Sequence, residues 1–425
     1  MLLIAVITLL IFLILGVPVS FAIGLSGFLA LVIGGEIPGF MAVQQMVRGM
    51  NSFALMAGPL FILAGEILGG AKLSDKILSF SRSTVSWMKG GMGAVTVVSN
   101  MIFAGISGSG AATMSSIGSI TIPELRKIGY KRPFIAALTA GAGSLGPIIP
   151  PSVNMIVYAS LTGYSIGKLF IGGVVPGIII GLCLILMCNI YARRHNVDQG
   201  TGSFSFSLAW KSFKESFFAL ITPFIIIGGV VTGVFTATES GVIACLYGLI
   251  CGFFIYRTLH IRDIVPIFKR AASSSAMLLM LMGIANIYSY IFARENVGAT
   301  INDFLLATST NPLVILFIII GIMLVIGCFM ETIAAMVVIL PVIYPIVIEL
   351  GIDPLMFGVV FSIATVVGGL TPPVGLYLFL SMSLTGAPFK EAIKYTLPVV
   401  GIVLATMILI IFVPSIVTFL PNLLM

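Results

Sequence analysis

Long apolar blocks separated by short polar stretches dominate this chain. A helix needs about 20 apolar residues to cross about 30 Å of hydrocarbon. We cut the sequence at its charged and turn-rich stretches, which leaves apolar blocks at residues 2–15, 19–34, 53–69, 92–123, 133–163, 169–191, 216–236, 240–256, 273–292, 312–345, 355–386 and 395–420. The pattern therefore predicts an all-α polytopic membrane protein.

Basic residues concentrate in a few of the polar stretches between these blocks. Of the 21 Lys and Arg residues, 18 lie in the stretches 70–91, 124–132, 192–214, 257–270 and 387–394. The positive-inside rule assigns these five stretches to the cytoplasm and the remaining polar stretches to the outside. On this assignment both termini are external, and the net charge of +7 reflects orientation in a bilayer rather than a groove for nucleic acid.

Four of the blocks run past 30 residues and contain Gly or Pro, which is typical of hairpins or broken helices. Both flanks of block 92–123 fall inside, and both flanks of block 312–345 fall outside. Each of these two blocks must therefore enter the membrane and return to the same face. We expect two opposed re-entrant hairpins, with blocks 133–163 and 355–386 as broken helices.

An internal repeat agrees with this arrangement. A shift of 222 residues aligns Gly105 with Gly327 and Gly146 with Gly368, so the matches fall where the helices are expected to break. The polar flank after the first hairpin is net positive, whereas its counterpart after the second is net negative. A repeat whose loops change charge sign is an inverted-topology repeat.

The repeat divides the chain into a first half at residues 1–210 and a second half at 211–425. Each half is expected to contain five spans and one hairpin. Residues 70–91 mix apolar and basic positions, and we interpret them as an amphipathic connector on the cytoplasmic surface.

The expected hairpin tips and helix breaks are rich in small residues and proline. At the first tip, residues 105–110 read Gly-Ile-Ser-Gly-Ser-Gly, and the facing break at 143–152 contains three prolines. Each proline removes an N–H and leaves an upstream carbonyl without its helical partner. Because free carbonyl and hydroxyl oxygens suit a hard monovalent cation, two pseudo-symmetric cation sites are expected. The alternative is that these residues only permit tight helix packing.

Helices that restart after the tips and breaks point their positive N-terminal ends toward the midplane, which suits an anionic group such as a carboxylate. The polar candidates for solute contact near these ends are Thr113, Ser116, Asn154, Arg294 and Glu331. Glu331 is an acid deep in the membrane, which makes it a functional candidate. Interhelical hydrogen bonds for the hydroxyl and amide groups, and a snorkelling side chain for Arg294, remain the alternatives.

Composition narrows the function classes. Charged residues make up 8% and hydrophobic residues 59% of the chain, whereas a soluble domain carries about 25% charged residues. Soluble enzymes, nucleic-acid binders and disordered proteins are therefore excluded. The sequence contains no metalloprotease, nucleophile-elbow, P-loop or dinucleotide-binding motif. We expect neither an enzyme nor a cofactor, and no transition metal.

Four motifs together resemble the large membrane subunit of tripartite ATP-independent periplasmic (TRAP) transporters. They lie at residues 103–112, 146–152, 233–240 and 369–375, and the resemblance covers essentially the whole chain. It is most similar to the sialic-acid branch. The resemblance implies a sodium-coupled importer in the bacterial inner membrane, so the external termini predicted above would lie in the periplasm. It also implies an elevator motion, a small four-helix membrane subunit and a periplasmic substrate-binding protein.

The family's sodium sites can be transferred by motif to this sequence. The first site would use Ser107, Ser109, Gly146, Ile149 and Pro151. By the inverted repeat, the second would use Gly327, Thr332, Gly368, Thr371 and Pro373. Sodium would act as the coupling ion for an organic-acid solute.

Three functional hypotheses follow. The first is a sodium-coupled carrier that depends on a binding protein and moves a carboxylate such as sialic acid. The second is a self-sufficient ion-coupled carboxylate carrier, which would take up solute without any soluble partner. The third is an ion channel, which ranks last because the sequence offers no ring of charged or carbonyl filter repeats.

Overall fold

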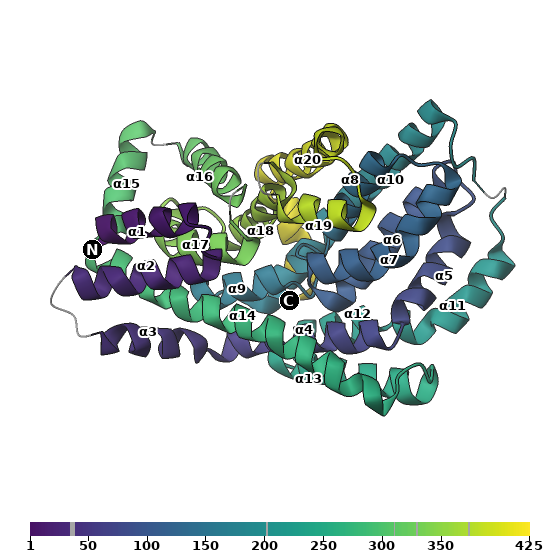
Figure 1. Cartoon of the computed structure of the whole chain (residues 1–425), viewed down its shortest axis with the longest axis horizontal. Coiled ribbons are helices and arrows are strands. Elements are labelled where there is room, and N and C mark those ends of the chain that lie inside the picture. Colours follow the sequence, from purple (N-terminus) through teal and green to yellow (C-terminus); the bar gives the residue numbers. More distant parts are fainter. Residues whose placement is uncertain (35–38, 201–202, 310, 329, 373–374) are drawn as a thin grey trace.

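The computed structural model describes residues 1–34, 39–200, 203–309, 311–328, 330–372 and 375–425. These residues form helices joined by short connections, and the described part contains no β-strand. Figure 1 shows α3, α4, α13 and α14 along the lower side of the molecule, with α11 and α12 beside them on the right and the broken helices above. The all-α fold predicted from the apolar blocks is confirmed.

Two helix pairs and two broken helices form the centre of the fold, in the same order in each half. In the first half they are α6 (Gly91–Ser107), α7 (Gly110–Ile128), α8 (Arg132–Gly143) and α9 (Val153–Thr162). In the second half they are α16 (Pro312–Gly327), α17 (Thr332–Glu349), α18 (Pro354–Leu370) and α19 (Leu376–Thr385). The tips and breaks fall where the sequence predicted them.

The other helices surround this centre. They are α1 (Leu2–Ile14), α2 (Val19–Ile33), α3 (Phe40–Met50), α4 (Phe53–Gly70), α5 (Leu73–Val85), α10 (Ile166–His195), α11 (Phe206–Leu220), α12 (Thr222–Val231), α13 (Ala237–Ile250), α14 (Ile261–Arg294), α15 (Val297–Thr308), α20 (Phe389–Phe412) and α21 (Ser415–Leu424). A π-helical turn at Cys251–Ile255 continues α13. By length and composition, 5 helices in the described residues can cross a membrane, or up to 7 if two bent pairs each count as one span.

Several elements differ from the sequence-based expectation. Helices α3 and α15 lie in stretches that we interpreted as polar loops. Helix α14 begins at Ile261 and α20 at Phe389, so each extends into a stretch assigned to a connection. Charged and polar residues mark the ends of apolar blocks but do not end a helix, because Lys, Arg and Glu are good helix formers.

The connector at 70–91 contains the amphipathic helix α5. Its apolar residues Leu73, Ile77 and Leu78 are buried, and α5 packs against α6 and α11. The apolar face of the connector therefore contacts protein, and a position on the membrane surface stays a prediction.

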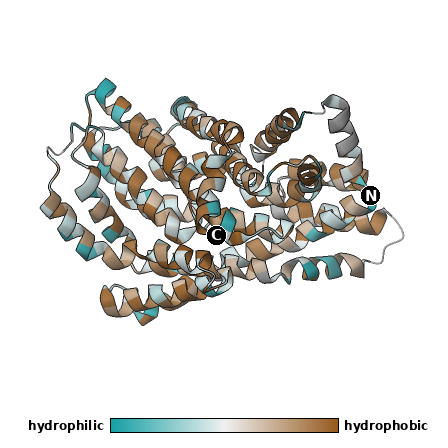
Figure 2. Ribbon diagram, turned by 180° about the vertical axis from the view of Figure 1, so that it is seen from behind, coloured by the Kyte–Doolittle hydropathy of each residue, from teal (hydrophilic) through white to brown (hydrophobic). Residues whose placement is uncertain are grey.

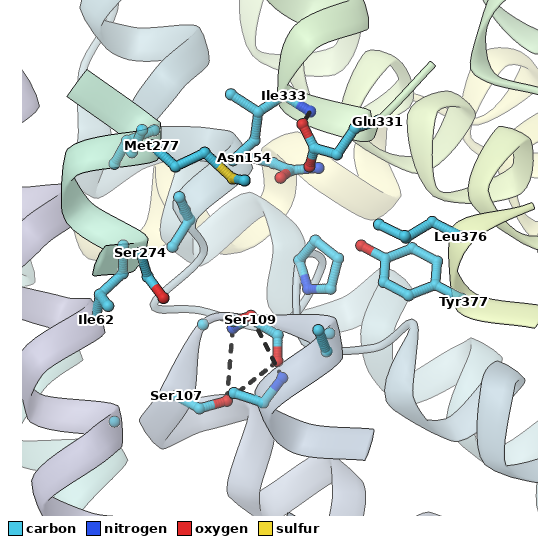
Figure 3. A pocket seen from close by; sticks show the side chains of 18 of the residues that line it. Ile62, Ser107, Ser109, Asn154, Ser274, Met277, Glu331, Ile333, Leu376 and Tyr377 are labelled. Carbon is cyan, nitrogen blue, oxygen red and sulfur yellow. Dashed lines mark hydrogen bonds between the residues drawn. The ribbon is translucent and has the colours of Figure 1, made fainter. Parts of the chain in front are cut away.

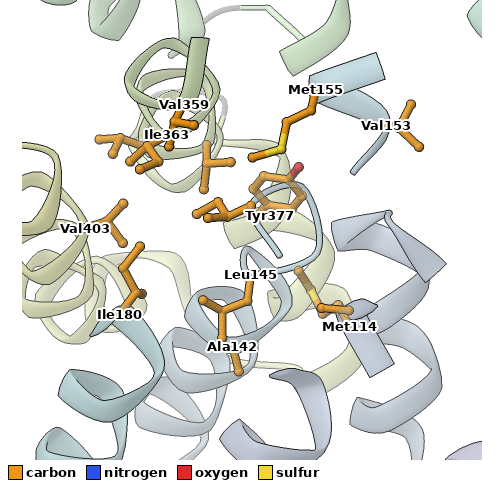
Figure 4. Close-up of a cluster of buried hydrophobic side chains, with 14 of the residues drawn as sticks. Met114, Ala142, Leu145, Val153, Met155, Ile180, Val359, Ile363, Tyr377 and Val403 are labelled. Carbon is orange, nitrogen blue, oxygen red and sulfur yellow. The ribbon is translucent and has the colours of Figure 1, made fainter. Parts of the chain in front are cut away.

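The outer surface and the interior are both apolar, as expected for a protein surrounded by lipid. Figure 2 shows hydrophobic residues along the outside of the helices, and Leu182 and Leu186 on α10 are each 59% exposed. Figure 4 shows a buried cluster where the two halves meet, with Met114 and Leu145 from the first half beside Ile363 and Tyr377 from the second. This shared core holds the two repeats together.

Candidate functional site

A cavity of about 200 Å³ lies where the two hairpin tips and the two helix breaks meet (Figure 3). The first tip contributes Ser107 and Ser109, and the second contributes Glu331. Helices α4 and α14 close the opposite side of the cavity. Segments far apart in the sequence therefore form one site.

Four helix N-termini surround this cavity. Its wall includes the first residues of α7 at 110–112, of α9 at 153–154, of α17 at 331–333 and of α19 at 376–377. Each helix N-terminus carries a partial positive charge. Side-chain caps accept from first-turn amides of α7, α9 and α17, whereas α19 has no side-chain cap. The predicted convergence of restarted helices is thus present, and the cavity has the features of an anion site.

The first tip is a tight turn between α6 and α7 that gathers neutral oxygens. Gly108 has a φ of 63°, in the left-handed region that favours glycine. The Ser107 hydroxyl lies 2.6 Å from Thr113 Oγ1, and the Thr113 hydroxyl donates to the Ser109 carbonyl at 2.7 Å. Three oxygen atoms from one turn therefore lie within a few ångströms of one another, in a part of the tip where Ser107 and Thr113 are buried.

The first tip packs directly on the first break. A β-carbon added at Gly146 would lie 2.7 Å from the backbone nitrogen of Gly110, so only glycine permits this approach. The Val153 N–H donates to the Gly108 carbonyl at 3.3 Å. Among the described residues, no hydrogen bond is donated to the carbonyls of Gly146, Ile149 or Pro151. The residues of the first predicted sodium site are thus neighbours, with carbonyl oxygens left for a ligand.

The second tip has a different chemistry. Glu331 caps α17, and its Oε2 accepts from the amides of Ile333 at 3.0 Å and Ala334 at 3.1 Å. Thr332 is 3% exposed, and within the described residues its hydroxyl makes no hydrogen bond of ordinary geometry, although Tyr377 lies beside it. An unpaired buried hydroxyl is costly, which makes Thr332 a candidate for a bound ligand.

The second tip also packs on the second break. A β-carbon at Gly368 would lie 2.5 Å from the Cα of Gly327, so the two glycines of the predicted second site are in backbone contact. The Thr371 hydroxyl donates to the Val367 carbonyl at 2.7 Å. Pro373, the last residue predicted for this site, lies outside the described residues.

The structure brings some of the solute-contact candidates to the cavity and leaves others elsewhere. Asn154 and Glu331 line it (Figure 3), and the Asn154 amide nitrogen lies 3.3 Å from Thr365 Oγ1 of the other half. Thr113 is fully buried behind the first tip. Ser116 lines an adjoining cavity.

Arg294 is not at this site. It ends α14, 13 residues beyond Leu281, which lines the cavity. At 1.5 Å per residue this separation is roughly 20 Å along the helix. Sequence analysis placed Arg294 at the external end of block 273–292, and α14 indeed ends there. A pairing of Arg294 with Glu331 stays a prediction.

Two residues that sequence analysis did not single out also line the cavity. Tyr377 comes from the first turn of α19, and Ser274 comes from α14 (Figure 3). Ser274 belongs to a run of serines at 273–275 inside an otherwise apolar helix, and this run could have indicated a polar face. Tyr377 gave no such indication, because it lies within an apolar run.

The chain matches the family model described as "Tripartite ATP-independent periplasmic transporter, DctM component" over residues 6–416. The chain belongs to this family. It is 36% identical over 405 residues to the isethionate TRAP transporter permease protein DctMQ of Oleidesulfovibrio alaskensis, a match that covers 95% of this chain and 64% of the relative. It is 32% identical to the sialic acid TRAP transporter large permease protein SiaM of Vibrio cholerae, covering 96% and 95% of the two chains.

Solved structures agree with the fold of this DctM-family chain. The structure titled "Structure and Function of Neisseria gonorrhoeae MtrF Illuminates a Class of Antimetabolite Efflux Pumps" aligns with a TM-score of 0.55 at 16% identity. The alignment covers 88% of this chain and 84% of that one. At this identity the likeness concerns the fold alone. The family itself places the chain among multi-pass transporter permeases rather than enzymes.

Proposed function

We propose that this chain is the large membrane subunit of a sodium-coupled importer for organic acids. The observation that carries the proposal is the convergence of four helix N-termini on one cavity between the hairpin tips. Such ends attract a carboxylate or sulfonate without requiring a fixed cation. Asn154 and Tyr377 supply polar contacts at the wall.

Sodium is the proposed coupling ion. Neutral hydroxyl and carbonyl oxygens surround the first tip, and the buried Thr332 hydroxyl lies beside Tyr377 at the second. Oxygen ligands of this kind suit a hard cation. Each sodium ion that moves inward across 100 mV would supply about 2.3 kcal/mol, so uptake of a monovalent acid with two sodium ions should respond to the membrane potential.

Movement of the site would follow an elevator mechanism. Helices α7, α8 and α19 pack on one another, as do α9, α17 and α18, so the tips and breaks of both halves form one contiguous bundle. This bundle would carry the solute past the layer of α4 and α14. The chain would work in the bacterial inner membrane with both termini in the periplasm.

Two partners complete the proposal. A small four-helix membrane subunit would join this chain, and a periplasmic binding protein would deliver the solute. The chain spans 64% of the length of its isethionate relative, and both partners are transferred here from the family. Isethionate and sialic acid each carry one anionic group, and sialic acid is the first solute to test.

The test is uptake of labelled sialic acid and labelled isethionate into proteoliposomes that contain this chain and its small subunit. The sodium gradient and the purified binding protein are each supplied or omitted. Uptake that needs both supports the proposal. Uptake without binding protein would favour a self-sufficient carrier, and uptake that ignores the sodium gradient would refute sodium coupling.

A further inference from the structure

A second cavity of about 610 Å³ adjoins the cavity between the tips. The two share Gly65 and Glu66 of α4, Ser109 at the first tip and Ser274 of α14 as wall residues. The second cavity continues along α4 to Gly70 and along α14 to Arg270. The distribution of basic residues assigns this end of both helices to the cytoplasm.

An ion pair lies in the wall of this second cavity. The Arg270 Nε lies 2.7 Å from Glu66 Oε2, with side-chain exposures of 55% and 25%. The contact uses Nε, so the terminal nitrogens of the guanidinium remain for another acceptor. An exposed pair of this kind contributes at most about 1 kcal/mol. A second carboxylate can therefore replace Glu66 on Arg270 at little cost.

Hydroxyl groups line the same cavity. Ser115 and Ser116 lie on α7, and Ser274 lies on α14. Ser115 and Ser274 are exposed to the cavity or its mouth rather than packed in the core. A guanidinium with several serine hydroxyls around it matches a solute that carries one acidic group and additional hydroxyl groups.

We propose that Arg270 binds the solute's acidic group on the solute's route between the tip cavity and the cytoplasmic end of the chain. The solute's acidic group replaces Glu66 on the guanidinium, and Glu66 takes Arg270 back when the solute departs. This inference rests on the proposed function for the direction of travel. Its core claim, that Arg270 gives the second cavity a preference for anions, can be tested without transport.

The test measures the charge preference of the cavity by cysteine labelling. Ser115→Cys is introduced after Cys183 and Cys328, the two partly exposed native cysteines, are changed to alanine, while the buried cysteines stay. The readout is the ratio of labelling rates for two probes of similar size, anionic sulfonatoethyl methanethiosulfonate and cationic trimethylammonioethyl methanethiosulfonate. A ratio cancels differences in the reactivity of the thiol itself.

Arg270→Gln should lower the anion-to-cation ratio about fivefold, and Glu66→Gln should raise it by a similar factor. Arg270→Lys should retain most of the ratio, since the charge is kept. The matched control is Lys269→Gln, which removes the same charge one residue away on a side chain that lines neither cavity. An equal effect of Lys269→Gln and Arg270→Gln, or no effect of either, would overturn the inference.

The two proposals fail in different ways. Labelling that depends on Arg270, in a protein that takes up no organic acid, would uphold the anion preference and refute the proposed function. Sodium-driven uptake, together with a labelling ratio that does not change in Arg270→Gln, would support the proposed function and refute the anion preference. If Ser115→Cys does not fold, Ser274→Cys on α14 reports on the same cavity.

Discussion

The two hairpin tips occupy equivalent positions in the repeat, yet they are built from different groups. The first tip holds the neutral oxygens of Ser107, Ser109 and Thr113 in a closed set of hydrogen bonds. The second tip holds the Glu331 carboxylate and a Thr332 hydroxyl that has no well-formed hydrogen bond within the described residues. Both tips nevertheless pack on their breaks through glycine.

This difference separates what the fold requires from what the chemistry requires. Backbone contact between tip and break is common to both halves, so it belongs to the architecture. The charge and the unpaired hydroxyl belong to the second half, so the two halves should bind ions with different strengths. The predictions below test this division.

The largest loss of uptake is expected from changes at the glycine contacts between tip and break, which the two halves share. Gly146→Ala and Gly368→Ala would each place a methyl group within 2.7 Å of backbone atoms of the tip. We expect each change to reduce uptake at least about 100-fold and to destabilise the fold by about 1–3 kcal/mol. Thermal unfolding in detergent and proteoliposome uptake measure the two effects.

Gly401→Ala on α20 is the matched control for these changes. A β-carbon at Gly401 would contact nothing within 4 Å, so alanine should be neutral or stabilising there. If Gly146→Ala is harmful and Gly368→Ala is tolerated, the architectural equivalence of the two halves fails.

The next effect concerns the charge at the second tip. In Glu331→Gln the amide oxygen can still accept from Ile333 and Ala334, so the helix cap should survive with a loss of about 1 kcal/mol or less. The negative charge is lost, and we expect sodium-driven uptake to fall at least about tenfold. Glu391→Gln, an exposed acid in the first turn of α20, is the control. Unchanged uptake in Glu331→Gln would show that the carboxylate serves only as a cap.

Much of this arrangement could be predicted from the sequence. Gly and Pro at residues 105–110 and 143–152 mark the first tip and break because few other residues fit these backbone conformations. The shift of 222 residues then located the second pair. The convergence of helix N-termini followed from the positions of the breaks.

The rest required tertiary structure. Tyr377 reaches the cavity because α19 packs on α7 of the other half, and no local pattern encodes that contact. Arg294 lies beyond the part of α14 that lines the cavity, and the apolar run gave no indication of which turns of the helix face the cavity. Helices α3 and α15 were missed because a short helix is stabilised mainly by tertiary packing, which the local sequence does not reveal. Helix α3 packs on α14, and α15 packs on α17.

A smaller effect distinguishes the hydroxyls of the two tips. Ser107→Ala removes a hydrogen-bonded hydroxyl, so without sodium it should destabilise the chain by about 1 kcal/mol. Within the described residues the Thr332 hydroxyl makes no hydrogen bond of ordinary geometry. Thr332→Val removes it at nearly constant shape, so without sodium the change should be neutral or stabilising. Both changes should weaken the stabilisation by added sodium. Melting curves across a sodium series measure this, and loss of stability in sodium-free Thr332→Val would mean that its hydroxyl is paired.

The smallest effect is a loss of stability, expected from a change in the polar stretch that follows the first hairpin. In the first half, Tyr130 donates to Asp198 Oδ2 at 2.8 Å, and the same carboxylate oxygen accepts from the Met92 amide at 2.8 Å. The repeat places Ile352 at the position equivalent to Tyr130, so the second half lacks this polar contact. Burial is the main cause that raises the pKa of the Tyr130 phenol above its usual range, and the nearby Cys188 and Asp198 raise it further.

Tyr130→Phe should therefore cost about 1 kcal/mol of stability and leave uptake unchanged. A phenol with a raised pKa contributes stability that is fully present below its unfolded pKa, about 10, and is lost only as the pH rises through the higher folded value. The difference in melting temperature between the two proteins should thus stay constant from pH 7 to pH 9. A difference that shrinks within this range would mean that the Tyr130 phenol ionises below pH 9, which would contradict its raised pKa.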